Sequence, residues 1–432
     1  MTTAPHPAAV PLHTPEHAAD PQRSFARLRE QGPVGLAELA AGVPVWVVTD
    51  YRAALELFHD HTGLWTKDTR GWMEYVPDDS PVRPMVQWRP SLFFADGQEH
   101  AHLRKVITDS FALLDPRHVR DTTLRHADTL LAEFSHTGRA DLVSQYARRL
   151  SPMVLNTLFG KTDDAAPQLI GAIEAMTSTD LARKAEGEQT LGAYLSTLYQ
   201  TKATQRGHDL TSWFIDHPND LSPEEVINQI LITQGAALET LTGLIANTAA
   251  RMLSDQRYRG TLTTGNLPIR HAIDDALWND PPLAMYSLHR PTRSVHFHGR
   301  HILQGQPVFV SYAAINTCPY TGQSAEGFRS DHKAHLAFAA GPHECPAQSI
   351  ALGVAIAAIE RLTATLPDIE LAVPADHLTY QPNPIYRVLT ALPCRFTPLA
   401  PTQGAPRQDR ATLRRTTAEP GLRATGRPPV SA

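Results

Sequence analysis

The stretch HLAFAAGPHECPA, residues 335–347, is the most informative feature of this chain. An apolar run leads into a turn of small residues and then to a single cysteine, Cys345. Pro346 and a long run rich in Ala, Leu and Ile follow, which predicts a helix from Pro346 to about Leu366. Backbone N–H groups and the positive dipole end favour a thiolate at a helix N-terminus. Such a thiolate suits axial ligation of heme iron, whereas a lone cysteine is otherwise most often a small buried side chain.

The same stretch resembles the heme-binding loop of the cytochrome P450 superfamily, Phe-Gly-x-Gly-x-His/Arg-x-Cys-x-Gly. Four of its positions match the pattern: Phe338, Gly341, His343 and Cys345. Two others, Ala339 and Ala347, stand where the pattern has glycine. The resemblance implies heme b as cofactor, with Cys345 as the iron ligand, Phe338 as a heme-binding residue and His343 as a candidate for binding a heme propionate.

Length, cysteine content and net charge exclude several other classes of protein. The 432 residues suffice for one large domain, and the three cysteines form neither a disulfide framework nor a Cys-x-x-Cys zinc pattern. A cytoplasmic location fits this cysteine content. The first 20 residues lack a basic segment followed by an apolar one, so we expect no signal peptide or membrane anchor. A net charge of −5 is too mild to indicate a nucleic-acid partner.

The chain is expected to hold a flexible segment over 1–20, one heme domain over 21–397 and a tail over 398–432. The tail contains six arginines against one aspartate and one glutamate, and it has almost no large apolar residue. Such a composition predicts disorder. Binding to an anionic surface or a partner is the alternative to an inert, solvated tail.

The periodicity predicts a mainly α fold with small β-sheets, the layout of the superfamily, in which heme lies between a central helix and the cysteine loop. That central helix opens at a capping box, Ser222 with Glu225, and runs to about Leu253. We expect it to be buried nearly all round, and its polar residues exclude a membrane span. The other expected elements are helices over 22–31 and 51–59, an irregular region over 65–93, strands over 45–49, 294–297, 301–303 and 307–312, and short strands around 378–380 and 385–396.

The central helix contains the run GAALETLT, residues 235–242, which resembles the oxygen-activation motif Ala-Gly-x-Glu/Asp-Thr of the family. The hydroxyl of Thr240 can bond back to its own helix and open a local groove. Glu239 beside it is suited to relay protons. The alternative is an Ala-rich packing face with one stray acid, which is disfavoured because a lone carboxylate on an apolar helix is costly.

The segment Glu99-His100-Ala101-His102-Leu103-Arg104 resembles the family's Glu-His-x-x-Leu-Arg, whose His and Arg bind heme propionates. His100 and Arg104 share one helix face at a spacing of four, so one propionate could meet both. An ordinary surface pair is the alternative. Alignment with the family's strand places His289 where a propionate-binding Arg is usual, with Arg290 adjacent.

The largest departure from the family lies where Glu-x-x-Arg is normal, because this chain has Asp275 and Trp278 there. Trp offers one N–H donor and cannot replace a guanidinium. Arg329 is the one arginine of the meander that follows. We expect packing to replace the ion pair, as in a divergent actinobacterial branch that the chain resembles.

The resemblance implies a heme-thiolate monooxygenase that oxidises a small organic substrate. No Gly-rich nucleotide fingerprint is present, so electrons are expected from an external ferredoxin and its reductase. The substrate is expected under the 65–93 region, near 283–288 and 383–386. The competing hypothesis is a non-catalytic heme protein, a sensor or binding subunit.

Overall fold

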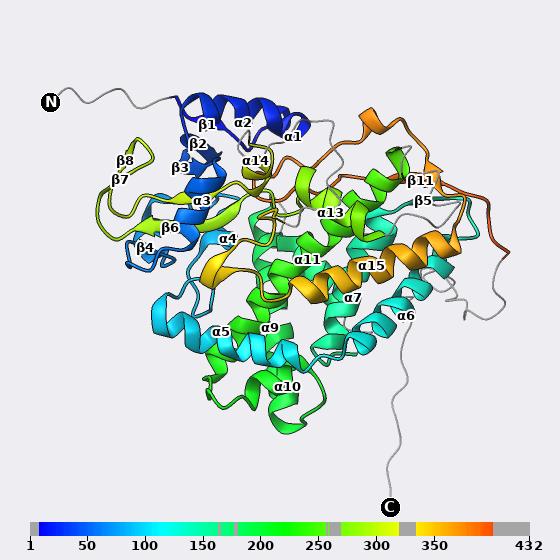
Figure 1. The fold of residues 1–432 in the computed structure, drawn as a ribbon. Coiled ribbons are helices and arrows are strands. Elements are labelled where there is room, and N and C mark those ends of the chain that lie inside the picture. The colour runs from blue at the N-terminus through cyan, green and yellow to red at the C-terminus, as the bar shows by residue number, and fades with distance from the viewer. Residues whose placement is uncertain are drawn as a thin grey trace, which may run out of the picture. The chain divides into compact units, whose positions relative to one another are not determined.

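The computed structural model describes residues 8–162, 166–176, 180–255, 258, 269–318 and 334–400. These residues are mainly helical, as predicted (Figure 1). The α-helices are α1 (Pro15–Ala19), α2 (Pro21–Glu30), α3 (Tyr51–Phe58), α4 (Arg83–Val86), α5 (Gly97–Ala112), α6 (Pro116–Phe134), α7 (Arg148–Leu158), α8 (Ala166–Met176), α9 (Leu181–Thr204), α10 (Leu210–Ile215), α11 (Pro223–Ser254), α13 (Ile269–Asn279), α14 (Tyr312–Asn316) and α15 (Gln348–Thr365).

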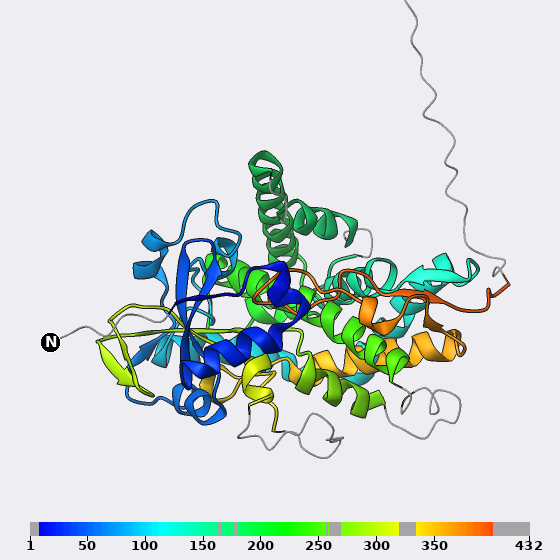
Figure 2. The same ribbon diagram turned by 90° about the horizontal axis from the view of Figure 1, so that it is seen from above.

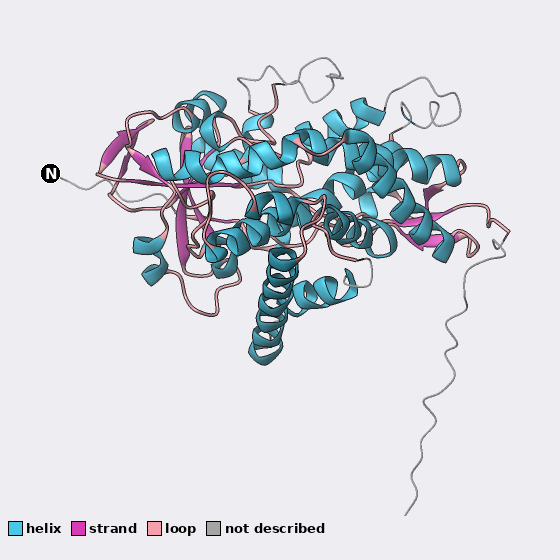
Figure 3. Ribbon diagram, turned by 90° about the horizontal axis from the view of Figure 1, so that it is seen from below, coloured by secondary structure: helices cyan, strands magenta, loops and turns pink. Residues whose placement is uncertain are grey.

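The strands gather in two places (Figure 3). The larger sheet has the order β1 (Val10–Pro11), β2 (Val34–Ala40), β3 (Val43–Val48), β9 (Val308–Val310), β6 (Tyr286–Pro291), β4 (Trp65–Thr66). Beside it lies the hairpin of β7 (Val295–Phe297) and β8 (Arg300–Ile302). A second, distant sheet joins β10 (Glu370–Leu371), β11 (Pro393–Arg395) and β5 (Arg139–Asp141).

Helix α11 runs through the centre of the helical part and packs against α7, α13 and α15 (Figure 2). The predicted capping box is present, because the Ser222 hydroxyl accepts from the Glu225 N–H while the Glu225 side chain accepts from the Ser222 N–H. From Leu241 to Ala250 every residue is buried. The expectation that this helix is buried nearly all round is wrong for its first half, where several side chains are partly exposed and some of them line a cavity.

Several predicted elements are confirmed within two residues, namely the helices over 22–31 and 51–59 and the strands over 294–297, 301–303 and 307–312. The helix after the cysteine begins at Gln348, so Pro346 lies in the turn before the helix and not at its first position. Strands β2 and β6 were not predicted. None of the described helices has the length and apolarity needed to cross a membrane. Arg329 and nearly all of the basic tail lie outside the described residues.

Candidate active site

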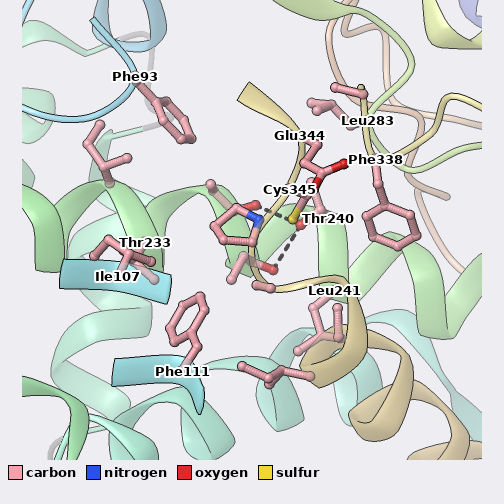
Figure 4. Close-up of a pocket in the computed structure, with 18 of the residues that line it drawn as sticks. Phe93, Ile107, Phe111, Thr233, Thr240, Leu241, Leu283, Phe338, Glu344 and Cys345 are labelled. Carbon is pink, nitrogen blue, oxygen red and sulfur yellow. Dashed lines mark hydrogen bonds between the residues drawn. The ribbon is translucent and has the colours of Figure 1, made fainter. Parts of the chain in front are cut away.

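A deep cavity opens between the first half of α11 and the loop that carries Cys345 (Figure 4). Its walls are mostly apolar, and Figure 4 shows Phe93 and Phe111 among the side chains around it. Cys345 and Thr240 both line it, one from the loop and one from the helix. Further apolar side chains come from α5, α7 and the segment after α13: Ile107, Val154, Leu155, Leu158, Leu283 and Leu288.

The cysteine loop is held by backbone hydrogen bonds and by two left-handed residues. The Cys345 N–H donates to the Phe338 carbonyl at 2.9 Å. Gly341 has a φ of +72°, and a Cβ there would clash with the Phe58 carbonyl oxygen, so glycine is required. Ala339 has a φ of +60° although it carries a Cβ, whereas Ala347 has an ordinary φ of −98°. Of the two alanines at family glycine positions, only Ala339 is therefore strained.

The Cys345 thiol is partly accessible from the cavity yet deeply enclosed by the protein. Burial raises the pKa of this thiol, whereas the backbone N–H of Ala347 and the charge of Arg104 lower it. No cluster of three or more metal-binding side chains exists among the described residues. A metal held here would consequently have Cys345 as its protein ligand and would need another molecule to supply the remaining ligands.

A group of basic side chains lies at one edge of the cavity. The rings of His100 and His343 stack with centroids 3.8 Å apart, and Arg104 donates to the Glu344 carbonyl oxygen at 2.8 Å. Burial, with help from Arg104 and Lys67, lowers the pKa of His100 to about 4. The pKa of His343 is lowered strongly by burial and by the same neighbours, and burial and Lys67 hold the pKa of His289 well below its usual value. Burial and the repulsion between neighbouring cations therefore both act against protonation of these histidines.

These residues fit heme. The Nε2 atom of His100 is buried and has no hydrogen-bond partner among the described residues, so the site lacks an acceptor that a bound molecule would bring. A thiol, apolar walls and an edge rich in positive charge correspond to the iron, the macrocycle and the propionates of heme. Phe338, which the sequence placed against the cofactor, also lines the cavity.

The two candidate catalytic residues point in different directions. The Thr240 hydroxyl donates to the Ala236 carbonyl at 2.6 Å, the back-bond expected from the sequence. The helix is continuous at this point, so the expected local groove is not formed. Glu239 does not line the cavity, and its carboxylate lies 3.4 Å from a guanidinium nitrogen of Arg148 on α7.

Other predicted positions lie apart from the cavity. Arg290 donates to the carbonyl oxygen of Gly305 at 2.9 Å, so the structure does not bring it to the basic edge. Asp275 pairs with Arg251 of α11 at 3.4 Å. Trp278 is buried and packs edge-on against His335, with ring centroids 5.7 Å apart. Residues 383–386 do not line this cavity, whereas 283 and 286–288 do.

Sequence reasoning missed Lys67, which lines the cavity and is buried with its ammonium group beside Ser287 and His289. Burial lowers its pKa to about 7, while Asp96 opposes that shift. The local signal was weak, because one lysine in an irregular region is ordinarily solvated. The contributions of α5 and α7 to the apolar wall were also missed.

The chain is similar to bacterial proteins along nearly its whole length. The 2-hydroxy-5-methyl-1-naphthoate 7-hydroxylase of Streptomyces carzinostaticus is 28% identical over 402 residues, 89% of this chain and 97% of the relative. The cytochrome P450 monooxygenase PikC of Streptomyces venezuelae is 29% identical over 397 residues, 88% and 92% of the two chains. Among solved structures, CYP154C4 from a Streptomyces species is 25% identical with a TM-score of 0.82, covering 90% and 98% of the two chains. No protein-family model matches the chain.

Proposed function

We propose that this chain, a heme-dependent monooxygenase of the cytochrome P450 superfamily by its similarity to the bacterial relatives, oxidises a small, largely apolar organic molecule. A hydroxylation or an oxidative coupling fits the site. The single observation that carries this proposal is the apolar cavity bounded by the Cys345 thiol on one side and by Thr240 on the other. The naphthoate hydroxylase to which the chain is similar supports the substrate class, because the substrate in its name is a small aromatic compound.

In this proposal Cys345 holds the cofactor, which when bound supplies an iron that activates dioxygen. His100, Arg104 and His343 bind its propionates at the basic edge, and Phe338 packs against it. Phe93 and Phe111 exclude water from the apolar end and orient the substrate by shape. We further propose an external ferredoxin and its reductase as electron source.

Thr240 and Glu239 share the handling of protons. The Thr240 hydroxyl faces the cavity, so it is placed to hold a proton there. The Glu239 carboxylate, paired with Arg148 and turned away from the cavity, is placed to exchange protons with the outside when that pair opens. At 3.4 Å and with both side chains partly exposed, the pair is weak enough to open.

The experiment combines spectroscopy with product analysis. The reduced protein with carbon monoxide should show the long-wavelength Soret band of thiolate ligation, and Cys345→Ser should lose it. Cys394→Ser is the matched control, because Cys394 is buried on β11 outside the cavity. With surrogate ferredoxin and reductase, a bound aromatic ligand should give an oxygenated product. A thiolate band without any product across a broad aromatic and polycyclic panel would favour a sensor or binding subunit instead.

A further inference from the structure

Lys67 occupies a position that an ordinary surface lysine does not. It follows directly after β4, which pairs antiparallel with β6 through Thr66 and Arg290. That pairing brings the ammonium group to Ser287, whose hydroxyl lies 3.0 Å away, and to His289, whose Nδ1 lies 3.4 Å away. The residue is only 6% exposed. A buried ammonium is costly unless an anion meets it.

The described residues place no carboxylate within ion-pair distance of the Lys67 ammonium. The charge of Asp96 acts on the Lys67 ammonium from a distance. The carboxylate of Asp96 itself accepts from the Lys67 backbone N–H at 2.9 Å and from the Thr66 hydroxyl. The fields of Lys67, His100 and His289 all act on His343 at the basic edge. The ammonium therefore belongs to the same group of side chains, and because Lys67 lines the cavity, an anion bound there would supply the partner that the described residues do not.

His289, beside Lys67, does not provide the positive charge that the family resemblance implies at its position. His289 is 5% exposed, and its Nδ1 lies 2.5 Å from the Ser287 carbonyl oxygen, a position from which Nδ1 donates to the backbone. Burial and the adjacent ammonium both disfavour a protonated ring there. At the strand position where the family resemblance implies arginine, this chain thus has a neutral side chain.

The backbone of β6 is arranged to hold Lys67. The register of β6 against β9 shifts between Tyr286 and His289, and Ser287 inside this bulge has a φ of +51°. A left-handed serine is strained, and such strain persists where the surroundings fix a functional geometry. The bulge turns the Ser287 hydroxyl toward the ammonium.

We propose that Lys67, oriented by Ser287, binds a carboxylate of the heme. The cationic contact to a propionate, which the family resemblance implies at position 289 of β6, would then come from the residue that follows β4. This inference rests on the proposed heme site. It assigns Lys67 a binding role and Ser287 a positioning role. A carboxylate on the substrate is the other source of the same chemistry, and the test separates the two.

The test measures heme release from the holoenzyme, by transfer to excess apomyoglobin. Loss of one charge-assisted hydrogen bond corresponds to roughly tenfold to hundredfold faster release in Lys67→Met. Ser287→Ala should give a smaller increase. Lys105→Met is the matched control, because Lys105 is exposed on α5 and pairs with Asp109 at 2.6 Å. The propionate bending modes in the resonance Raman spectrum should shift in Lys67→Met and stay unchanged in the control.

The outcomes are distinct. Unchanged heme release and unchanged propionate modes in Lys67→Met would overturn the inference. If that variant instead weakens binding of carboxylate-bearing ligands alone, the partner is the substrate, and the inference is equally overturned. A retained thiolate band with carbon monoxide shows in either case that the proposed heme site, on which this inference rests, stands. Absence of that band from the unmodified protein would remove the proposed function itself.

Discussion

The hydroxyl of Thr240 donates to the carbonyl oxygen of Ala236, one turn earlier on α11, at 2.6 Å, and also approaches the Ala237 carbonyl at 3.3 Å. The helix nevertheless continues without interruption from Pro223 to Ser254. The hydroxyl is thus tethered to its own backbone while it faces the cavity. In the proposed role a proton that it holds would be delivered at a fixed place, and we expect removal of the hydroxyl to leave the helix intact.

Thr240→Ala should therefore uncouple electron use from product formation. Because a positioned proton donor contributes on the order of 10²-fold or more, we expect product per NADPH to fall at least ~10-fold while hydrogen peroxide release rises. The measurement compares NADPH consumed, product and hydrogen peroxide with a confirmed substrate.

Thr233→Ala is the control for this prediction. Thr233 also lines the cavity and also bonds back to its helix, to the Gln229 carbonyl at 2.7 Å, but it lies two turns from Thr240. Uncoupling confined to the Thr240 variant supports a proton-handling role. Equal uncoupling in both variants would mean that cavity shape, and not the Thr240 hydroxyl, sets the coupling.

The two alanines at family glycine positions should respond oppositely to glycine. Ala339 is in the left-handed region, where a Cβ costs roughly 1–2 kcal/mol, so Ala339→Gly should raise the free energy of unfolding by up to about 1 kcal/mol after the entropy of the unfolded chain is counted. Ala347 has an ordinary φ, so Ala347→Gly should lower it by about 0.5–1 kcal/mol.

Denaturation of the holoproteins, followed through loss of the Soret band and by circular dichroism, measures both changes under one protocol. We expect the free energy of unfolding to change in opposite directions in the two variants. A destabilised Ala339→Gly variant would show that the left-handed conformation at that position carries no strain.

Trp278 should not tolerate the arginine that the family has at this position. It is 3% exposed and packs on His335, and Asp275, the acid of the motif, already pairs with Arg251. A guanidinium placed there would be buried without its full partner set. We expect Trp278→Arg to destabilise the protein by about 2–4 kcal/mol.

Trp278→Phe keeps an aromatic ring and should cost less, roughly 1–2 kcal/mol. Melting temperatures of the two variants with heme bound give the comparison. A higher melting temperature for the arginine variant than for the unmodified protein would contradict packing as the role of Trp278.

The sequence was most informative where function depends on neighbours along the chain. The cysteine loop, the back-bond of Thr240 and the capping box of α11 all involve residues within eight positions of one another, so their spacing alone indicates them. The fold class followed from helical periodicity for the same reason. The resemblance to the family then supplied the order of these segments.

What the sequence could not predict depends on contacts between distant segments. Lys67 meets Ser287 across 220 residues, through the pairing of a two-residue strand that carries no periodic signal. Ala339 and Ala347 read alike as replaced glycines, and only their backbone angles separate them. Arg290 is adjacent to His289 in sequence, yet successive residues of a strand point to opposite faces, which takes its guanidinium to Gly305.

Pro346 directly follows Cys345, the proposed iron ligand. In the family pattern this residue supplies a backbone N–H toward the thiolate sulfur, and proline has none. The structure places Pro346 in the turn before α15, where the Ala347 N–H interacts with the Cys345 sulfur and so keeps one donor. Fewer hydrogen bonds to sulfur leave a more electron-rich thiolate, which favours the ferric over the ferrous state.

Pro346→Leu should accordingly raise the heme reduction potential, by an amount on the order of tens of millivolts. Pro346→Ala restores the same N–H with a small side chain, so it should shift the potential in the same direction if the donor, and not bulk, is responsible. Both potentials are to be measured by spectroelectrochemistry without substrate, so that a bound substrate does not itself shift the potential. A potential that stays constant or falls in both variants, with the thiolate band retained, would show that this missing donor does not control the iron.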